Sequence, residues 1–551
     1  MSAEQTSMNQ LITDNIDTWT STVKTKSAAG RGSSKKRELY GVKKLRELIL
    51  ELAVRGKLVP QDPTDEPASV LLERIAAEKA QLVKDKIISR TKALPALLDG
   101  DIPNDLPKGW SMVRLGNLTS KLGSGSTPRG GKNVYTTEGI PFLRSQNVRN
   151  EGIKLDDIAY IPVEVHQKMD KTKVIPSDVL LNITGASLGR STVFPESLVE
   201  ANVSQHVTII RLIERQMSQF VHLGILSPMV QRLVWGRQVG MAIEGLSKKV
   251  LEMFEFPVPP LKEQHRIVAK VDELMSLCDQ LEQQTEASIE AHQVLVTTLL
   301  DTLTNSADAD ELMQNWARIS EHFDTLFTTE ASIDQLKQAI LQLAVMGKLI
   351  PFGETKETTL KSILTFGPRN GFSPKEVPSE TNVKVLKLGA TSYGELNVEQ
   401  SKFVDVDVSD KPHLYLTKGD ILIQRGNSAN FVGSNVLIQE SYSSLIYPDL
   451  MMKLRVNEEI LPKYASLVLS SKQSREHMWR QMTGTSGTMP KISKKVVEGV
   501  PVFFPVDLVR QKLVIDKYDE QIDICDQLKS RLKESQTTQL HLTDAIVEQA
   551  V

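Results

Sequence analysis

LAVRGKLVP at residues 52–60 recurs as LAVMGKLIP at residues 343–351, with seven of nine letters identical. Each stretch is an apolar run that ends with Gly and Lys, and Pro follows three residues after the Lys. Glycine favours the left-handed conformation just beyond a helix, and proline cannot continue one. The stretch therefore predicts two equivalent helix ends and indicates an internal repeat.

Other stretches extend the repeat in both directions. Three further pairs match: ITDNIDT (12–18) with ISEHFDT (319–325), LSKKVLE (246–252) with ISKKVVE (492–498), and VDELMSLCDQL (271–281) with YDEQIDICDQL (518–528). The first copy holds 16 extra residues near KTKSAAGRGSSKKR (24–37), whose composition predicts a flexible basic linker. The two cysteines, Cys278 and Cys525, fall at matching positions, and their small number and spacing predict reduced core thiols.

The ends of each copy agree and carry a helical pattern, whereas the middles diverge. Apolar side chains recur at spacings of four and three in the first copy, which predicts a coiled-coil seam; they are Ile267, Val271, Leu274, Cys278 and Leu281. A helix from about Leu261 to Leu303 would be roughly 60 Å long, too long to pack within one small globule. The middles instead hold short apolar, β-branched runs such as VTIIRL (207–212), separated by Gly, Pro, Asn and Ser, which predict strands.

These patterns predict an α+β protein with two strand-rich domains joined by long helices. The expected segments are a helical N-terminal segment with the basic linker (1–107), a strand-rich domain (108–260), a central helical region (261–355), a second strand-rich domain (356–505) and a C-terminal helix (506–551). Residues 304–310, TNSADAD, predict a break between two helices of the central region.

Charge separates the strand-rich domains from the helices. The whole chain of 551 residues has a formal net charge of −2, but residues 108–260 carry +5 and residues 356–505 carry +4, against −10 for residues 261–345. An anionic polymer such as DNA would be attracted to the two domains and repelled by the helices, unless a partner covers them. Solvated helices also carry Asp and Glu for solubility alone, so charge by itself does not decide between these interpretations.

The sequence predicts neither secretion nor a membrane span. No apolar run approaches the roughly 18 residues that a membrane helix needs, and the N-terminus lacks the basic-then-apolar order of a signal peptide. We therefore expect a cytoplasmic protein that does not associate with membranes.

The sequence also lacks the motifs of catalysis. GSGSTPRGGKN (123–133) misses the glycine spacing of a phosphate-binding loop, and no stretch has the adenine-methyltransferase, zinc-protease or serine-hydrolase pattern. His206 is expected to pack or to form a local hydrogen bond rather than to ligate a metal. We therefore expect no catalytic residue, no metal site and no cofactor, although carboxylate-lysine nuclease sites are too degenerate to be excluded from sequence.

Several stretches resemble the specificity subunits of type I restriction-modification systems. They are LRELILELAVRGKLVPQDPTDEPASVLLERIAAEKAQL (45–82), GSTPRGGKNVYTTEGIPFLRSQNV (125–148), VIPSDVLLNITGASLGRSTVF (174–194), ANVSQHVTIIRL (201–212) and GLSKKVLEMFEFPVPPLKEQHRIV (245–268). The resemblance covers nearly the whole chain. It is weaker in residues 356–505, where GPRNGFSPKE (367–376) stands in place of the GSTP stretch (125–128) of the first domain.

This resemblance implies a function for each segment. The two strand-rich domains would be target-recognition domains, each reading one half of a split double-stranded DNA sequence. The long helices would be antiparallel coiled coils that fix the distance between the domains, with the two copies related by a pseudo-twofold axis. The repeated ends would dock two methyltransferase subunits, and restriction (translocase) subunits would join that core. The LAVxGKLxP stretch would then occur twice because two domains and two partners must be placed.

Candidate DNA-binding residues are polar side chains expected on loops, because such side chains read base edges and bind phosphates. In the first domain they are Thr127, Arg129, Lys132, Asn133, Tyr135, Arg144, Gln146, Asn147, Asn182, Thr184, Ser187 and Arg190. In the second domain they are Arg369, Asn370, Lys375, Lys387, Thr391, Tyr393, Gln424, Arg425, Asn427 and Asn430. Neighbouring glycines are expected to shape turns rather than to contact bases; they are Gly123, Gly125, Gly185 and Gly189.

Other classes of function stay open at the level of sequence. The chain could be a specificity subunit whose partner fuses nuclease and methyltransferase, which co-purification of one kind of partner would reveal. It could also be a DNA-modifying enzyme that acts alone, which the purified chain with DNA, S-adenosylmethionine and a divalent metal would reveal. A coiled-coil adaptor is a further option, but it leaves the two divergent basic domains unexplained.

Overall fold

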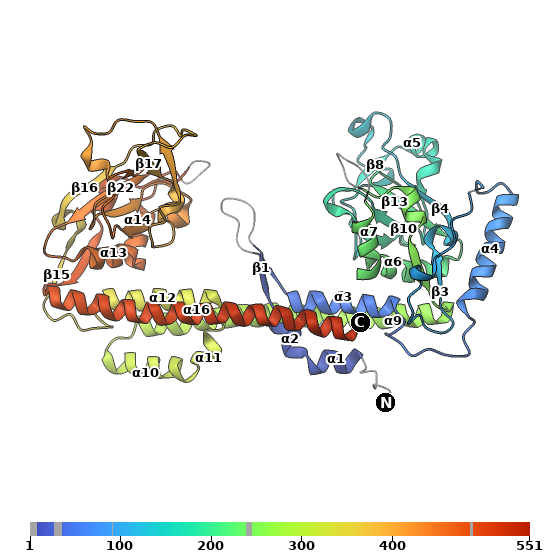
Figure 1. Ribbon diagram of the computed structural model, residues 1–551, viewed down its shortest axis with the longest axis horizontal. Coiled ribbons are helices and arrows are strands. Elements are labelled where there is room, and N and C mark those ends of the chain that lie inside the picture. The colour runs from blue at the N-terminus through green and yellow to red at the C-terminus, as the bar shows by residue number, and fades with distance from the viewer. Residues whose placement is uncertain (1–7, 27–35, 91, 239–244, 485–488) are drawn as a thin grey trace. The chain divides into compact units, whose positions relative to one another are not determined.

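The computed structural model describes residues 8–26, 36–90, 92–238, 245–484 and 489–551, which form a mixture of helices and sheets (Figure 1). The chain divides into two compact units. Among the described residues, unit 1 comprises those within 8–26, 36–286 and 538–551, and unit 2 comprises those within 287–537. The chain passes between the units within two long helices, α9 (Leu261–Thr304) and α16 (Leu508–Ala550). The predicted long helix is confirmed, and its C-terminal end lies one residue beyond the expected position.

The N-terminal helices of unit 1 pack against the C-terminal end of the chain. These elements are α1 (Met8–Asp14), α2 (Ile16–Ser21), β1 (Lys24–Lys26), β2 (Lys36–Glu38), α3 (Tyr40–Val54) and α4 (Ala68–Lys84). The Thr22 and Thr543 hydroxyls lie 3.1 Å apart, and the Tyr40 hydroxyl donates to Asp544 at 2.8 Å. The ends of the predicted basic linker pair as the antiparallel strands β1 and β2, and residues 27–35 of that prediction lie outside the described residues.

The strand-rich domain of unit 1 contains two four-stranded sheets. The first has the order β11-β10-β13-β4 and the second has the order β8-β5-β12-β9. Their strands are β4 (Thr119–Ser124), β5 (Ile140–Leu143), β8 (Ala159–Ile161), β9 (Lys173–Val174), β10 (Val179–Asn182), β11 (Ser191–Val193), β12 (Ala201–Val203) and β13 (Val207–Leu212). A separate antiparallel pair, β3 (Ser111–Arg114) with β14 (Glu255–Val258), brings the two ends of the domain together.

Short elements complete this domain. They are β6 (Val148–Arg149), β7 (Gly152–Ile153), α5 (Val163–Lys168), α6 (Ser218–Leu226), α7 (Pro228–Gly236) and α8 (Lys248–Glu252). Phe220 of α6 lies against both Phe256 and Trp110, with ring centroids 6.1 and 6.2 Å apart. Helix α6 therefore packs on the face of the domain near β3 and β14.

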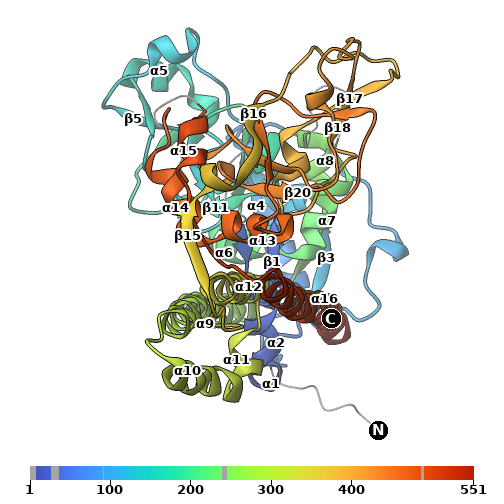
Figure 2. The same cartoon turned by 90° about the vertical axis from the view of Figure 1, so that its left-hand side faces the viewer.

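The helical part of unit 2 contains α10 (Ala309–Glu321), α11 (Phe323–Leu326) and α12 (Glu330–Val345). Helix α12 packs beside α9 and α16, which are seen nearly end-on in Figure 2. Lys337 of α12 forms an ion pair with Asp526 of α16, and Gln335 donates to Thr297 of α9 at 2.9 Å. Residues 305–308 separate α9 from α10, so the predicted helix break is confirmed.

In the strand-rich domain of unit 2, one sheet has the same strand order as its counterpart in the first domain, whereas the second sheet has three strands instead of four. One sheet has the order β16-β22-β19-β20, a second has the order β18-β17-β21, and β15 pairs with β23. The strands are β15 (Thr355–Thr359), β16 (Leu364–Asn370), β17 (Val383–Leu386), β18 (Ser401–Val404), β19 (Ile421–Gln424), β20 (Asn435–Leu437), β21 (Leu445–Ile446), β22 (Met451–Val456) and β23 (Pro501–Pro505). Its helices are α13 (Pro462–Ser470), α14 (Lys472–Arg480) and α15 (Lys494–Glu498).

The two copies of the opening stretch end their helices in the same way. Gly56 and Gly347 have φ values of +68° and +72°, in the left-handed region that glycine adopts without strain. Lys57 and Lys348, which follow them, donate their backbone N–H groups to the carbonyls of Leu52 and Leu343. The predicted helix ends are therefore confirmed. Both cysteines are free and buried, as predicted.

Candidate nucleic-acid interface

The loop after β10 carries three of the predicted DNA-binding residues, a fourth, Asn182, ends the strand itself, and backbone hydrogen bonds close the loop. Asn182 N–H donates to the carbonyl of Arg190 at 2.8 Å, and Gly189 N–H donates back to the carbonyl of Asn182 at 3.0 Å. Gly185 and Gly189 have φ values of +68° and +84°, where a side chain would be strained. The loop is thus a fixed platform, and these two glycines shape it as predicted.

The loop after β19 is its counterpart in unit 2. Gln424 N–H donates to the carbonyl of Ser434 at 2.8 Å, and Gly433 N–H donates to the carbonyl of Gln424 at 2.8 Å. Gly433 also has a positive φ, of +83°. Six residues lie between Asn182 and Gly189, whereas eight lie between Gln424 and Gly433. The two loops therefore share their closure and differ in length and composition.

A buried amide at the end of the central strand ties this loop to a second one in each domain. The side chain of Asn182 donates to the carbonyl of Ser145 at 2.8 Å, in the turn after β5. The side chain of Gln424 donates to the carbonyl of Leu388 and to the Thr391 hydroxyl, both at 3.0 Å, in the turn after β17. Two loops from different sheets are thereby held side by side within each domain.

Four predicted DNA-binding residues are buried and bonded within their own domain, so they hold loops rather than face solvent. These residues are Asn147, Asn182, Thr391 and Gln424. The Asn147 side chain accepts from Arg144 N–H at 3.0 Å and donates to the carbonyl of Lys154 at 3.0 Å. A buried polar group without partners is costly, and these contacts satisfy the buried amide donors, whereas Asn182 Oδ1 has no partner among the described residues. Their burial places these four residues away from the solvent-exposed loop surface.

The loop after β4 contains the largest group of exposed candidates. Thr127, Arg129, Lys132 and Asn133 are exposed there, and Tyr135 is partly buried against Phe142. The Thr127 hydroxyl donates to Gln205, which links this loop to the turn before β13. Gly125 shapes the loop by close approach, since a Cβ there would lie 1.9 Å from the carbonyl oxygen of Val203. Gly123, by contrast, lies within β4 and forms no turn.

Asp157 is a polar residue of this surface that the sequence did not single out. It accepts from Gln146 Nε2 at 2.8 Å through its carboxylate and from Arg144 Nη2 at 2.6 Å through its backbone carbonyl. Its φ of +55° is unusual for a residue other than glycine. The exposed carboxylate can accept from a base edge, and the arginine and amide beside it can donate to one. No sequence pattern marks this conformation.

The remaining candidates of the first domain line the loop after β10. Thr184, Ser187 and Arg190 are half-buried there, and the Thr184 hydroxyl lies 2.7 Å from His206 Nδ1. His206 thus forms a local hydrogen bond, as predicted.

In the second domain the candidates occupy a strand edge as well as loops. Arg369 and Asn370 belong to β16 rather than to a loop, which corrects their expected placement. Tyr393 is exposed beside Phe431, with ring centroids 5.8 Å apart. The other exposed or half-buried candidates are Lys375, Lys387, Arg425, Asn427 and Asn430.

A helix behind each loop contributes one further residue that sequence reasoning missed. Gln231 of α7 donates to the carbonyl of Gly189 at 2.9 Å, and Arg475 of α14 donates to the carbonyl of Asn430 at 2.7 Å. Burial lowers the pKa of Arg475 to about 10. Gln231 and Arg475 are 244 positions apart and occupy corresponding places in the two copies of the repeat. An alignment of the two copies could therefore have found them.

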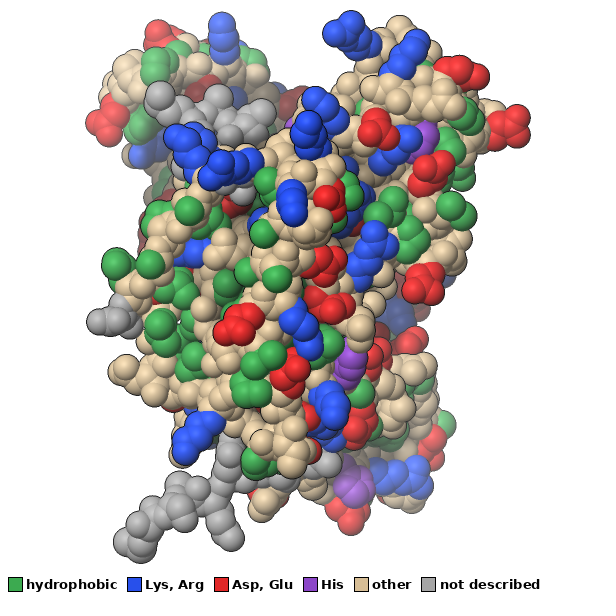
Figure 3. Space-filling model, turned by 90° about the vertical axis from the view of Figure 1, so that its right-hand side faces the viewer, with side chains coloured by type: hydrophobic (Ala, Val, Ile, Leu, Met, Phe, Trp, Pro, Cys, Tyr) green, Lys and Arg blue, Asp and Glu red, His purple; other side chains and the backbone are tan. Residues whose placement is uncertain are grey.

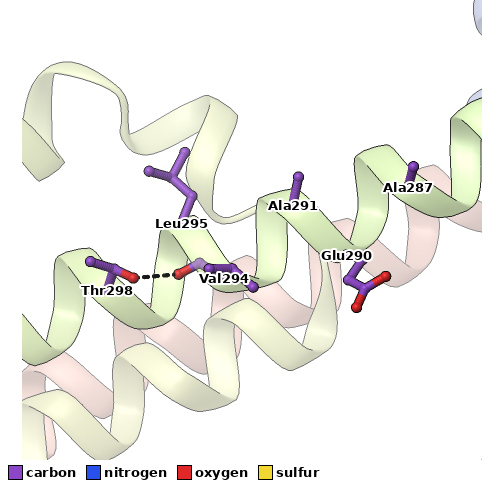
Figure 4. A pocket seen from close by; sticks show the side chains of 6 residues that line it. All are labelled: Ala287, Glu290, Ala291, Val294, Leu295 and Thr298. Atoms are coloured by element: carbon purple, nitrogen blue, oxygen red, sulfur yellow. Dashed lines mark hydrogen bonds between the residues drawn. The ribbon is translucent and has the colours of Figure 1, made fainter.

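Charged side chains of both signs are distributed over the surface of the protein. Figure 3 shows Lys, Arg, Asp and Glu side chains interspersed over the face that it presents. A hollow on α9 is lined by Ala287, Glu290, Ala291, Val294, Leu295 and Thr298 (Figure 4). Its lining holds one carboxylate and no cation, so it lacks the groups that bind phosphate.

Two other kinds of feature are absent from the described part of the chain. No group of three or more His, Cys, Asp or Glu side chains in the described residues could hold a metal ion. None of the described helices has both the length and the apolar character needed to cross a bilayer.

Comparison with known proteins identifies the family. Residues 107–291 match the type I restriction modification DNA specificity domain. The chain is 36% identical to the type I restriction enzyme EcoEI specificity subunit of Escherichia coli, over 99% of this chain and 100% of that protein. The chain belongs to the specificity subunits of type I restriction enzymes. These subunits are the non-catalytic components of their enzyme complexes.

Further similarity is found within the same family. The type I restriction enzyme EcoAI specificity subunit of Escherichia coli is 34% identical over 99% of this chain and 100% of its own length. Among solved structures, the HsdS subunit from Thermoanaerobacter tengcongensis is 16% identical, with a TM-score of 0.40 over 81% of this chain and 98% of that chain.

Proposed function

We propose that this specificity subunit recognises a bipartite double-stranded DNA target, with each strand-rich domain reading one half. The observation that carries the proposal is that the two domains share the same buried amide contacts but differ in the loops that these contacts hold. Asn182 and Gln424 tie together equivalent loops in the two domains, yet those loops differ in length and in side chains. A common frame with different loops is expected of two readers with different half-sites.

The reading surface is assigned to side chains that reach solvent. In the first domain they are Thr127, Arg129, Lys132, Asn133, Tyr135, Arg144, Gln146, Thr184, Ser187 and Arg190, together with Asp157. In the second domain they are Arg369, Asn370, Lys375, Lys387, Tyr393, Arg425, Asn427 and Asn430. Arginine and lysine suit guanine and phosphate, asparagine and glutamine suit adenine, and the carboxylate suits cytosine.

The long helices α9 and α16 are assigned two roles: they set the spacing between the half-sites, and the helical region binds the partner subunits. As antiparallel coiled coils related by a pseudo-twofold axis, α9 and α16 would fix the distance between the half-sites. The repeated helical ends offer two equivalent surfaces, which suits two methyltransferase subunits, with restriction subunits joining that core. The acidic charge of the helical region would then lie against protein rather than DNA. We place the complex in the cytoplasm.

Domain exchange tests this proposal. Residues 108–260 are replaced by the corresponding domain of a relative with a different target, and the host methylome is sequenced. One half of the methylated motif should change, while the other half and the gap should stay. The reciprocal exchange of residues 356–505 is the matched control and should change the opposite half. A change of both halves in either chimera would contradict independent reading.

A further inference from the structure

The loops after β10 and β19 can be aligned from the glycine that closes each of them. Gly189 and Gly433 each donate their N–H group to the carbonyl of the residue that ends the preceding strand. The two glycines therefore correspond, and the residues just before them that are 244 positions apart occupy equivalent places. By this alignment Ser187 of the first domain is the counterpart of Phe431 of the second.

The loops after β5 and β17 can be aligned by their own backbone hydrogen bonds. Asn147 and Ala390 each donate their N–H group to the carbonyl three residues earlier, and the carbonyl of each accepts from the N–H group seven residues later. Both residues lie four positions after the end of their strand, and they are 243 positions apart. By this alignment Asn150 of the first domain is the counterpart of Tyr393 of the second.

At these two positions the first domain has polar side chains and the second has aromatic ones. Asn150 and Ser187 belong to the first domain, whereas Tyr393 and Phe431 belong to the second. The two rings meet edge to face, with centroids 5.8 Å apart and an interplanar angle of 82°. Tyr393 is 85% exposed and Phe431 is half-buried. We call Tyr393 and Phe431 the aromatic pair; it presents apolar surface to solvent where the first domain has an amide and a hydroxyl.

The residue that precedes each ring is held by a hydrogen bond from elsewhere in the domain. The Ser392 hydroxyl accepts from Gln424 Nε2 at 3.1 Å, and the carbonyl of Asn430 accepts from Arg475 Nη2 at 2.7 Å. The two loops that carry the aromatic pair are therefore fixed before any ligand arrives. A surface that is already ordered loses little conformational freedom on binding, which favours its use in recognition.

From this contrast we infer that the aromatic pair contacts the C5-methyl group of a thymine in the half-site that the second domain reads. The inference rests on the proposed function and deepens it by naming a base. The methyl group is the apolar feature that distinguishes thymine in the major groove, and an apolar side chain is its natural partner. Asn430, next to Phe431, is exposed, and asparagine pairs best with adenine, so this group of side chains favours an A·T base pair.

The test removes the methyl group from the DNA. The full-length subunit is assembled with the methyltransferase subunits of its own system and is bound to duplexes that carry the site found by methylome sequencing. In these duplexes deoxyuridine replaces each thymine of the second domain's half-site in turn. At one position at least, the replacement should weaken binding roughly 4-fold, as expected when one methyl group is withdrawn from an apolar contact.

Two variants assign the effect to the aromatic pair. Tyr393→Asn/Phe431→Ser carries the side chains of the first domain, and it should bind the thymine and deoxyuridine duplexes equally. Its methylome should show relaxed recognition at that same position and an unchanged first half-site. Tyr393→Phe is the conservative variant, which keeps both rings and should retain the difference between the two duplexes. Thermal unfolding of each variant checks the fold, and the deoxyuridine series on the wild type decides the question by itself.

Three results would overturn the inference. They are equal affinity of the wild type for every deoxyuridine duplex, a second half-site without an A·T base pair, and loss of a methyltransferase subunit from the double variant in native mass spectrometry. In the last case a protein partner, rather than DNA, would occupy the aromatic pair. A wild-type complex that binds no bipartite site would instead refute the proposed function itself.

Discussion

Asp178 and Arg211 form a two-point ion pair inside the first domain, with Nε to Oδ1 and Nη2 to Oδ2 both at 2.8 Å. Asp420 and Arg455 form the counterpart in the second domain, where Nε lies 3.0 Å from Oδ1. Both carboxylates are buried at the start of the central strand of their sheet, and both arginines lie on the neighbouring strand. The pair thus fixes strand register in each domain.

Removing this carboxylate should destabilise one domain. Asp178→Ala leaves Arg211 without its partner at a largely desolvated site, and we expect a loss of about 3 kcal/mol in the free energy of unfolding of the first domain. Urea unfolding of the full chain, followed by a probe in each domain, measures the change. Asp156→Ala is the matched control, because that carboxylate is exposed, and it should change stability by less than about 0.5 kcal/mol.

Each buried amide, Asn182 or Gln424, should affect recognition of only one half-site of the DNA target. Asn182→Ala removes the donor to Ser145 in the first domain, and Gln424→Ala removes the donors to Leu388 and Thr391 in the second. Each change should cost about 1 to 3 kcal/mol, because buried partners lose their hydrogen bonds. Methylome sequencing should show relaxed recognition in one half-site for Asn182→Ala and in the opposite half-site for Gln424→Ala. Equal relaxation of both halves by either variant would refute local anchoring.

His222 should make stability depend on pH. It is buried on α6, with Nδ1 3.3 Å from the Ser191 hydroxyl, and burial lowers its pKa from 6.5 to about 4. The folded state therefore binds fewer protons than the unfolded state between these two values. The contribution of His222 to stability is fully present above pH 6.5 and is lost as the pH falls towards 4.

The free energy of unfolding should fall by roughly 2 kcal/mol between pH 6.5 and pH 5 through His222 alone. The reason is that one pH unit corresponds to about 1.36 kcal/mol for a single proton. Thermal unfolding over this range measures it. His222→Gln, which does not titrate, should flatten the slope. An exposed histidine, His265, provides the control: His265→Gln should leave the slope unchanged. A slope that persists in His222→Gln would assign the dependence to other groups.

The sequence predicted the features that local chemistry determines. The helix ends at Gly56 and Gly347, the long helix beginning at Leu261 and the strand at 207–212 all follow from glycine conformation or apolar periodicity. It could not separate Asn147 and Asn182 from exposed candidates, because a polar residue at a strand end has the same local pattern whether it faces solvent or a neighbouring turn. That distinction depends on contacts with Ser145 and Lys154, which only the tertiary fold brings close.

The helix-borne supports were missed for a related reason. Gln231 and Arg475 lie on short helices, where a polar residue is ordinarily solvated, so nothing local indicates that each one bonds to a loop carbonyl. The strained backbone of Asp157 also leaves no trace in the sequence. Comparison of the two copies would have found the supports but not Asp157.

The length of the long helices should set the gap between half-sites, and the structure identifies where to change it. The break at 304–310 is a poor site for an insertion, because Lys348 Nζ donates to the carbonyls of Thr304 and Ser306. These hydrogen bonds fix the backbone of the break. The chain instead passes between the two units within α9, after Glu286, and within α16, after Thr537. Seven residues inserted at both points add two helical turns and preserve a heptad pattern.

Such a double insertion lengthens each helix by about 10.5 Å, which equals about three base pairs of DNA at roughly 3.4 Å each. Methylome sequencing should show both half-sites unchanged and the gap between them wider by about three base pairs. Inserting seven residues in α9 alone is the matched control, because the helices would then differ in length and assembly should fail. Four residues at both points would rotate the apolar faces out of register and should also impair assembly. An unchanged gap with full methylation in the double insertion would show that these helices do not determine the spacing.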